Sequence, residues 1–339
     1  MPYHLEIPDF GSLSSEQRRA VRHDGSIRLK GGPGTGKSLV SLWRALGEAS
    51  GENVLILTYT LSLEFYFNKM LESARSKGNS KNIKIKRSQL SYYHASTMLS
   101  SHFDEIILDE AQDMKPEEIS LFAQTAKRVS FGADYRQQLY PDKAASEQTL
   151  IDTLPVSRTF EMNRNYRSTQ QILKAVRAFF PERSIPAEVI AGSSVGAPAQ
   201  VYVCNHREEA SATFSLLKEI ILKTDGNIGV LVPSERKVQE VFETIQDSLP
   251  NDTTEYRSST AGSSLNNMGR VHVSTYKSSK GLEWDVVILP YFGGRDWWIS
   301  NTQVDLNDHY VAMTRAKNQL WLVSSNQGDK NILNSAYHV

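Results

Sequence analysis

The sequence contains one cysteine, Cys204, and it has no excess of charge of either sign. A single cysteine excludes an internal disulfide and a thiolate metal cluster. Lys plus Arg number 38, as do Asp plus Glu, so any basic surface for nucleic acid has to be a local patch. The first residues lack a basic segment followed by an apolar run, and no apolar stretch of about 18 residues occurs. These absences predict a cytoplasmic protein that does not enter a membrane.

Short apolar runs alternate with amphipathic segments along the chain, a pattern typical of βαβ units and parallel sheets. The length, 339 residues, suits about two domains of roughly 100–200 residues each. We therefore expect an α/β fold with domains 1–157 and 158–339, each an open, mostly parallel sheet flanked by helices. Strands are expected at 27–30, 53–59, 105–109, 129–133, 158–162, 200–204, 228–232, 271–276, 286–290 and 319–324. Helices are expected at 37–49, 62–75, 116–127, 169–180, 208–223, 235–248 and 308–317, and loops at 76–83 and 250–269.

The most specific motif runs from Gly31 to Ser38, GGPGTGKS, and fits the pattern G-x4-G-K-[ST]. Backbone N–H groups of such a loop turn inward around phosphate oxygens, and the helix that follows favours anions at its N-terminus. Lys37 can reach the β- and γ-phosphates, and the Ser38 hydroxyl can ligate Mg²⁺. A plain glycine-rich turn is the weaker alternative. The motif predicts nucleotide binding by Gly32, Pro33, Gly34, Thr35, Gly36, Lys37 and Ser38.

A second motif, EIILDEAQD at 105–113, places acidic residues directly after an apolar strand. A P-loop enzyme needs one carboxylate for Mg²⁺ and another to orient and deprotonate the attacking water. Asp109 suits the metal and Glu110 suits the water. An acidic helix N-terminus, stabilised by the helix dipole, is the alternative. None of the eight histidines stands at metal-ligand spacing with a second ligand, so we expect no metal besides the Mg²⁺ of the nucleotide.

GGPGTGKS followed by ILDEAQD resembles superfamily 1 helicases of the UvrD/Rep type. SSEQRRAV, DYRQQLY, NYRS, TYKSSKGLE and YVAMTRA match further motifs in the family's order, from position 17 to 316. The resemblance implies two RecA-like P-loop NTPase domains that use ATP and Mg²⁺ at the cleft between them. It also implies nucleotide contacts from Gln17 and Tyr166 at the adenine, Glu283 at the ribose, and Gln137, Arg167 and an arginine finger, Arg315, at the γ-phosphate.

The same resemblance implies contacts to a nucleic-acid strand, with aromatic rings stacking on bases and polar groups meeting phosphates. The implied residues are Thr58, Tyr59, Thr60, Tyr93, His94, Tyr140, Thr275 and Lys277. Lys77, Lys81, Lys84, Lys86 and Arg87 form a basic stretch that is either a phosphate track or a solvated face. Adjacent tryptophans in a predicted loop, Trp297 and Trp298, are either core plugs or an interface.

Several positions depart from the family pattern. Asp142 and Lys143 stand where Trp and Arg are usual, Leu39 replaces an arginine, and Lys277 replaces a histidine. The intervals from Lys37 to Asp109 and from Arg167 to Thr275 leave no room for the accessory domains of full-size members.

The sequence thus predicts an ATP-dependent helicase-like motor core that acts on single-stranded DNA. One alternative is a nucleotide-dependent switch or regulatory ATPase subunit of a larger complex, for example with a nuclease, and RNA as the strand is another.

Overall fold

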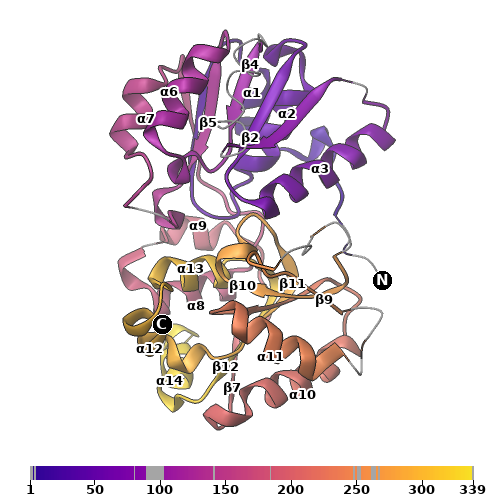
Figure 1. Cartoon of the computed structure of the whole chain (residues 1–339), viewed down its shortest axis with the longest axis vertical. Helices are drawn as coiled ribbons and strands as arrows, with labels where there is room; N and C mark the ends of the chain where they lie inside the picture. Colours follow the sequence, from indigo (N-terminus) through magenta and orange to yellow (C-terminus); the bar gives the residue numbers. More distant parts are fainter. Residues whose placement is uncertain are drawn as a thin grey trace. The chain divides into compact units, whose positions relative to one another are not determined.

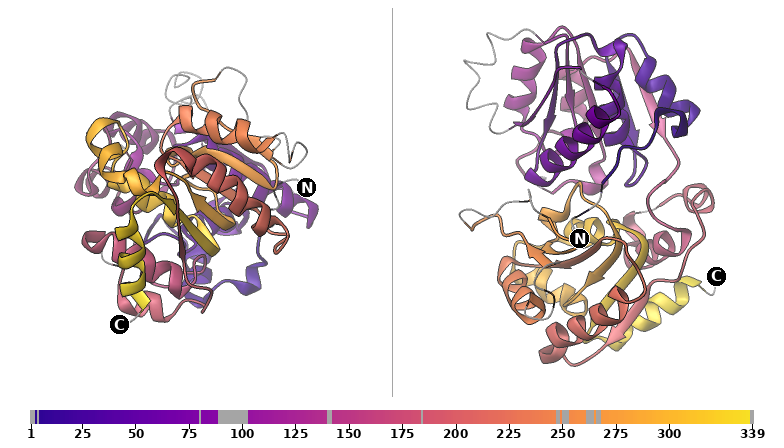
Figure 2. Two further views of the ribbon diagram at one scale, coloured as in Figure 1. Left: turned by 90° about the horizontal axis from the view of Figure 1, so that it is seen from below. Right: turned by 90° about the vertical axis from the view of Figure 1, so that its right-hand side faces the viewer.

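The computed structural model describes residues 3, 5–79, 81–88, 103–139, 142–183, 185–246, 249, 253–260, 265 and 268–337. The chain divides into two compact units. The N-terminal unit is Leu5–Arg164, and the C-terminal unit joins Met1–His4 to Asn165–Val339. The figures show each sheet with helices on both of its faces (Figure 1, Figure 2). None of the helices in the described part of the chain is both long and apolar enough to span a bilayer.

The N-terminal unit contains a six-stranded parallel sheet in the order β3-β2-β4-β5-β1-β6. Its strands are β1 (Ile27–Gly31), β2 (Val54–Thr58), β3 (Ile83–Arg87), β4 (Glu105–Leu108), β5 (Val129–Ala133) and β6 (Arg158–Met162). Its helices are α1 (Ser15–Arg22), α2 (Lys37–Leu46), α3 (Leu61–Ser76), α6 (Pro116–Thr125) and α7 (Glu147–Thr153). Strands β2, β4 and β5 are buried throughout, as expected for a parallel sheet covered on both faces.

Two apolar cores cover the faces of this sheet. Phe131 on β5 packs with Phe122 of α6, whereas Leu29 on β1 packs with Val40 of α2. The register pairs Arg28 with Phe131, so Leu29, the next residue, points to the opposite face.

A buried ion pair ties α2 to the sheet of the N-terminal unit. Nε of Arg44 lies 2.7 Å from Oε1 of Glu105, and both side chains are fully buried. The guanidinium also donates to the carbonyl oxygens of Ala20 and His23, at 3.2 and 2.9 Å, and Ser130 donates to Glu105. This network, in which the buried Oε2 of Glu105 has no hydrogen-bond partner among the described residues, holds the helix that begins at Lys37 against the strand that precedes Asp109.

The C-terminal unit contains a second six-stranded parallel sheet, in the order β7-β12-β11-β8-β10-β9. Its strands are β7 (Gln200–Val203), β8 (Ile228–Val232), β9 (Thr253–Glu255), β10 (Val271–Thr275), β11 (Trp284–Leu289) and β12 (Ala316–Ser324). Its helices are α8 (Gln170–Phe179), α9 (Ala187–Ala191), α10 (Glu209–Ile221), α11 (Glu235–Gln246), α12 (Arg295–Asn301), α13 (Leu306–Met313) and α14 (Gln327–Tyr337). A Cβ at Gly229 of β8 would come within 2.6 Å of the buried Trp284 ring, so this strand needs glycine there.

The predicted α/β fold, with two open parallel sheets flanked by helices, is confirmed, and several details differ from the prediction. Strand 158–162 pairs with β1 and belongs to the first sheet, so the second unit begins at Asn165 rather than at 158. The alternating exposed and buried residues of this strand are compatible with either sheet. The local sequence of an edge strand does not indicate which strand it pairs with.

The sequence interpretation also missed elements. The helix expected at 308–317 ends at Met313, and Trp297 and Trp298 lie in the short helix α12 rather than in a loop. Strand β3 contains part of the predicted basic stretch, and β9 lies inside the loop expected at 250–269. Helices α1 and α14 were not expected.

Candidate nucleotide and nucleic-acid sites

The predicted phosphate loop lies between the end of β1 and the start of α2. Gly34 and Gly36 have φ angles of 70° and 84°, in the left-handed region that favours glycine. A Cβ at Gly36 would also come within 2.5 Å of Nε2 of Gln17. Thr35 Oγ1 donates to the carbonyl oxygen of Gly32 at 2.9 Å, which closes the loop. Its shape therefore depends on glycine at the positions where the motif has it.

Lys37 and Ser38 open α2 and face different parts of the site. Nζ of Lys37 donates to the carbonyl oxygens of Gly31 and Gly32, at 2.8 and 3.1 Å. Ser38 Oγ donates to Oδ2 of Asp109 at 2.8 Å, although the two residues are 71 positions apart. Asp109 follows β4 and is 1% exposed. The structure thus brings the two predicted Mg²⁺ ligands into contact.

The donor set around Ser38 fits a cation that arrives with a nucleotide. Mg²⁺ takes six oxygen ligands and is usually held by one or two protein oxygens together with phosphates and water. Within the described residues, no three His, Cys, Asp or Glu side chains gather as a metal site. Ser38 and Asp109 would therefore hold the ion together with phosphate oxygens.

Gln17 packs beside the phosphate loop and is 3% exposed. It is part of the capping box of α1, in which its Oε1 accepts from the Ser14 N–H at 2.9 Å. Its Nε2 donates to the carbonyl oxygen of Thr35 at 3.2 Å. The predicted adenine contact is therefore placed next to the loop, and its amide also holds that loop.

Glu110 and Gln137 are linked through two residues to which the sequence interpretation gave no role, Gln112 and Asp134. Glu110 has a φ of 55°, a conformation that a non-glycine residue rarely adopts. Gln112 Nε2 donates to Glu110 Oε2, and Gln112 Oε1 accepts from the Asp134 N–H at 3.0 Å. Gln137 Nε2 donates to Asp134 Oδ2 at 2.7 Å. The position of Gln112 inside the DEAQD motif was the available signal.

In the C-terminal unit, Arg167, Glu283 and Arg315 lie together. Nε of Arg167 is 2.8 Å from Oε2 of Glu283, and its Nη1 is 3.5 Å from the Thr314 carbonyl oxygen. Burial disfavours the charge of Glu283, but Arg167, Lys317 and Arg315 outweigh it and hold the pKa of this carboxyl below its usual range. Glu283 is therefore ionised at neutral pH.

The other nucleotide candidates of this unit differ in exposure. Arg315 is 2% exposed and donates to the carbonyl oxygen of Val311 at 2.9 Å and to Thr314 Oγ1 at 3.1 Å. Tyr166 is 48% exposed. Tyr3, which the sequence interpretation missed, donates its hydroxyl to the Glu283 carbonyl oxygen at 2.6 Å. Nothing local in the first residues indicates this contact.

The parallel sheet separates the nucleotide candidates of the C-terminal unit from its nucleic-acid candidates. Glu283 and Arg315 directly precede β11 and β12, whereas Thr275 ends β10 and Lys277 follows it. The first pair thus lies at the edge where strands begin, and the second pair at the edge where they end, here called the carboxyl edge. Thr275 Oγ1 donates to Ser278 Oγ at 3.0 Å, and Lys277 Nζ donates to the Gln303 carbonyl oxygen at 2.8 Å.

Thr58 ends β2, Tyr59 and Thr60 follow it, and all three have structural roles. Thr58 is buried, and Thr60 caps α3 by accepting from the Leu63 N–H at 3.2 Å. Tyr59 is partly buried against the core around Leu57. Tyr93, His94 and Tyr140 lie outside the described residues.

Most of the basic stretch is engaged within the protein. Lys77 bonds Asp9 at 3.1 Å, Lys81 bonds Ser50 Oγ at 2.8 Å, and Arg87 pairs with Glu64 at 3.4 Å. Lys84 lies over the Phe103 ring at 5.6 Å. These partners favour a structural and solvated face over a phosphate track. The two adjacent tryptophans differ in burial. Trp298 is 9% exposed and packs into the core, whereas Trp297 is 57% exposed.

Residues 270–323 match the family model of the UvrD-like helicase C-terminal domain. In this segment the chain is similar to UvrD-like helicases. The matched segment contains Thr275, Lys277, Glu283 and Arg315, the candidates from the fifth and sixth motifs. The match supports a helicase-type motor and a nucleotide hydrolase in general terms, and helicases of this kind generally use ATP with Mg²⁺ and bind nucleic acid.

No curated protein matches this chain in sequence. Among solved structures it is similar to the one titled "The structure of PRRSV helicase", with 15% identity and a TM-score of 0.48. The similarity covers 92% of this chain and 54% of that chain, so this chain spans about half the length of the chain it matches.

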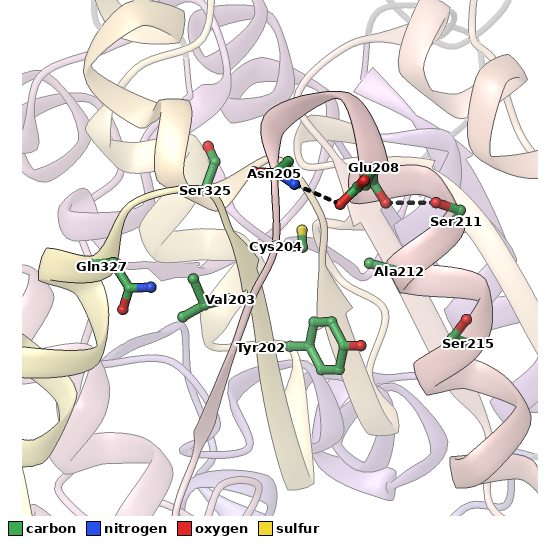
Figure 3. A pocket seen from close by; sticks show the side chains of 10 residues that line it. All are labelled: Tyr202, Val203, Cys204, Asn205, Glu208, Ser211, Ala212, Ser215, Ser325 and Gln327. Atoms are coloured by element: carbon green, nitrogen blue, oxygen red, sulfur yellow. Dashed lines mark hydrogen bonds between the residues drawn. The ribbon is translucent and has the colours of Figure 1, made fainter.

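A cavity of about 690 Å³ lies beside β7 and α10, apart from the residues above (Figure 3). Asn205 Nδ2 donates to Glu208 Oε2 at 3.0 Å, and Ser211 Oγ donates to the Glu208 carbonyl oxygen at 2.9 Å. Burial raises the pKa of the Cys204 thiol in this cavity to about 11. The thiol is thus protonated at neutral pH and is a poor nucleophile.

Proposed function

We propose that this protein is an ATP-dependent motor that hydrolyses ATP and acts on single-stranded DNA. The observation that carries the proposal is the contact between Ser38 and Asp109 beside the glycine-rich loop. A hydroxyl and a carboxylate that meet at the base of a phosphate loop are the pair that a nucleotide-bound Mg²⁺ needs.

Five candidate residues of the N-terminal unit have a role in this proposal. Lys37 neutralises phosphate charge, and Ser38 and Asp109 hold Mg²⁺. Glu110 orients and deprotonates the attacking water, and Gln137 responds to the γ-phosphate. The hydrogen-bond chain from Glu110 through Gln112 and Asp134 to Gln137 supports joint positioning of base and sensor.

The C-terminal unit supplies positive charge in the same proposal. Phosphoryl transfer places negative charge on equatorial oxygens in the transition state, and Arg167 and Arg315 would stabilise it. Glu283 would bind the ribose and Tyr166 the adenine. A nucleotide that engages residues of both units would couple hydrolysis to their relative motion.

The strand would contact Tyr59 in one unit and Thr275 and Lys277 in the other. Base stacking tolerates every sequence, because each base has an aromatic face. Base stacking does not distinguish DNA from RNA, so the experiment includes both strands.

The test measures the affinity for a fluorescent single-stranded DNA with no nucleotide, with ADP and with a non-hydrolysable ATP analogue, at rising salt. A motor is expected to change its affinity about fivefold or more between nucleotide states, and to bind more weakly as salt rises. Lys37→Ala is the matched control and should lose the nucleotide dependence. Equal affinity in all states would contradict the motor and favour a switch or regulatory subunit that responds to a protein partner, such as a nuclease. An RNA competitor compares the two strands.

A further inference from the structure

Lys277 and Asp308 come from different elements of the C-terminal unit and lie against each other. Lys277 opens the 3-10 helix after β10, Lys277–Ser279, and Asp308 is in the first turn of α13. Nζ of Lys277 is 3.7 Å from Oδ2 of Asp308. The Lys277 side chain is 30% exposed, whereas that of Asp308 is fully buried. A partly exposed ammonium group therefore covers a buried carboxyl group.

The carboxyl group of Asp308 also caps its own helix. Oδ2 of Asp308 accepts from the Asp305 N–H at 2.9 Å, and Oδ1 of Asp305 accepts from the Asp308 N–H at 2.9 Å. Within the described residues, the buried Oδ1 of Asp308 has no hydrogen-bond partner. A buried carboxylate is costly unless a cation is near, so Lys277 stabilises its charged form.

Asp308 changes charge near neutral pH. Burial and the charge of Asp305 raise its pKa to about 7, against the lowering effect of Lys277. The phenol of Tyr276 lies within its electrostatic reach. His309 is next to it, but burial lowers the pKa of that imidazole to about 4 and keeps it neutral. Removal of Lys277 would therefore favour protonation of Asp308.

Helix α13 also packs against α8, β11 and β12. The charged residues on these elements are Lys174 and Arg177 on α8, Asp285 on β11 and Lys317 on β12. Lys317 and Asp285 pair with each other at 3.3 Å, and Arg177 is exposed.

We propose that Asp308 competes with the phosphate of a bound strand for Lys277, so that an ionised Asp308 takes up a proton when the strand binds. The flexible stem of a lysine lets its ammonium group move from one anion to the other. When Lys277 turns to a phosphate, the buried carboxylate loses its cation and takes a proton from solvent. Asp308 thus sets the affinity of the carboxyl edge for a strand without touching the strand.

The inference rests on the proposed strand binding, and the experiment separates the two. The affinity of the full chain for a fluorescent single-stranded DNA is measured at pH 6 and pH 8, for the wild type and for Asp308→Asn. Asparagine keeps an acceptor for the Asp305 N–H and removes the charge. The wild type is expected to bind up to about tenfold more weakly at pH 8, the limit for one proton with a pKa near 7. Asp308→Asn should bind more tightly than the wild type at pH 8 and show a smaller pH effect.

Two controls isolate the route through Lys277. Asp305→Asn changes the other half of the same capping box and should keep most of the wild-type pH effect. In a Lys277→Met background, Asp308→Asn should leave the affinity unchanged, since its effect requires the lysine.

The possible outcomes distinguish failure of the proposed function from failure of this inference. A wild type that binds no strand at either pH contradicts the proposed function, and the inference falls with it. A strand affinity whose pH dependence is the same in the wild type and in Asp308→Asn overturns the inference alone. Should Asp308→Asn fail to fold, calorimetry of wild-type strand binding at pH 7, in buffers of different ionisation enthalpy, replaces it. Uptake of about half a proton is expected there, and no uptake overturns the inference.

Discussion

Arg167 and Glu283 form an ion pair at 2.8 Å, although 116 positions separate them in the chain. Glu283 is held from its other side as well, because its carbonyl oxygen accepts from the Tyr3 hydroxyl at 2.6 Å. Two side chains that the proposed mechanism assigns to one nucleotide thus hold each other in position before it binds. Such preorganisation lowers the entropy cost of binding.

The first prediction concerns Glu283. Glu283→Gln should weaken ATP binding by about 1.5–3 kcal/mol, the usual range for a hydrogen bond to a charged group. It should also reduce the preference for ATP over an analogue that lacks the ribose hydroxyls. The KM for both nucleotides in steady-state hydrolysis checks this. An unchanged preference would contradict the assignment of Glu283 to the ribose.

The second prediction concerns the arginine finger. Arg315→Ala should lower turnover by about 10³ or more and leave nucleotide binding nearly intact. Arg315 is buried and donates hydrogen bonds to Val311 and Thr314, so its removal could also destabilise the fold. The thermal denaturation of Arg315→Ala is therefore compared with that of the wild type. Arg207→Ala, at an exposed arginine of the same unit, is the control. Normal turnover by a folded Arg315→Ala variant would contradict the role of Arg315 as the arginine finger.

The third prediction concerns the strand contact after β2. Tyr59→Ala should weaken binding of single-stranded DNA by about 1–3 kcal/mol, without a change in hydrolysis in the absence of a strand. Tyr59→Phe keeps the ring and should bind almost as the wild type does. Fluorescence anisotropy gives the affinities. Equal binding by all three proteins would place the strand elsewhere.

The fourth prediction concerns Gln112, which joins the proposed base to the proposed phosphate sensor. Gln112→Ala would leave the buried Asp134 N–H without its acceptor, which costs about 1–3 kcal/mol. It should also slow hydrolysis, since the Glu110 carboxylate loses the amide that donates to it. Denaturant unfolding and turnover are both measured. A variant with wild-type turnover would show that Glu110 needs no such support.

The fifth prediction follows from the raised pKa of Asp308. A carboxyl whose pKa rises from 3.8 to about 7 on folding binds a proton that the unfolded chain has released. This group therefore lowers stability as the pH rises from about 4 to 7, and the effect levels off above 7. The melting temperature of Asp308→Asn, relative to the wild type, should increase over that range. A constant difference between pH 4 and pH 8 would contradict the buried, titrating carboxyl.

Local signals were enough for the central strands and for the glycine-rich loop. Each central strand is a short apolar run, and the loop needs glycine at fixed positions, so both are visible in a single sequence. The edge strand β6 was assigned to the wrong half because sheet membership depends on pairing, which leaves no local pattern.

Other contacts between distant segments could not be predicted, because no motif links the residues involved. The hydroxyl of Tyr3 reaches Glu283 across 280 positions, and Lys277 reaches Asp308 only after α13 is in place. Motif matching suggested which residues matter, but not that Thr58 would be buried or that Thr60 would cap α3. Those roles follow from the packing around them.

The most direct test of the central claim is steady-state ATP hydrolysis without nucleic acid and with single-stranded DNA, duplex DNA or RNA, with Lys37→Ala as the blank. A working motor core is expected to show stimulation of about tenfold or more by single-stranded DNA, a difference of about 1.4 kcal/mol in the barrier. Turnover that stays at the level of the blank, or that no strand changes, would contradict the proposed motor.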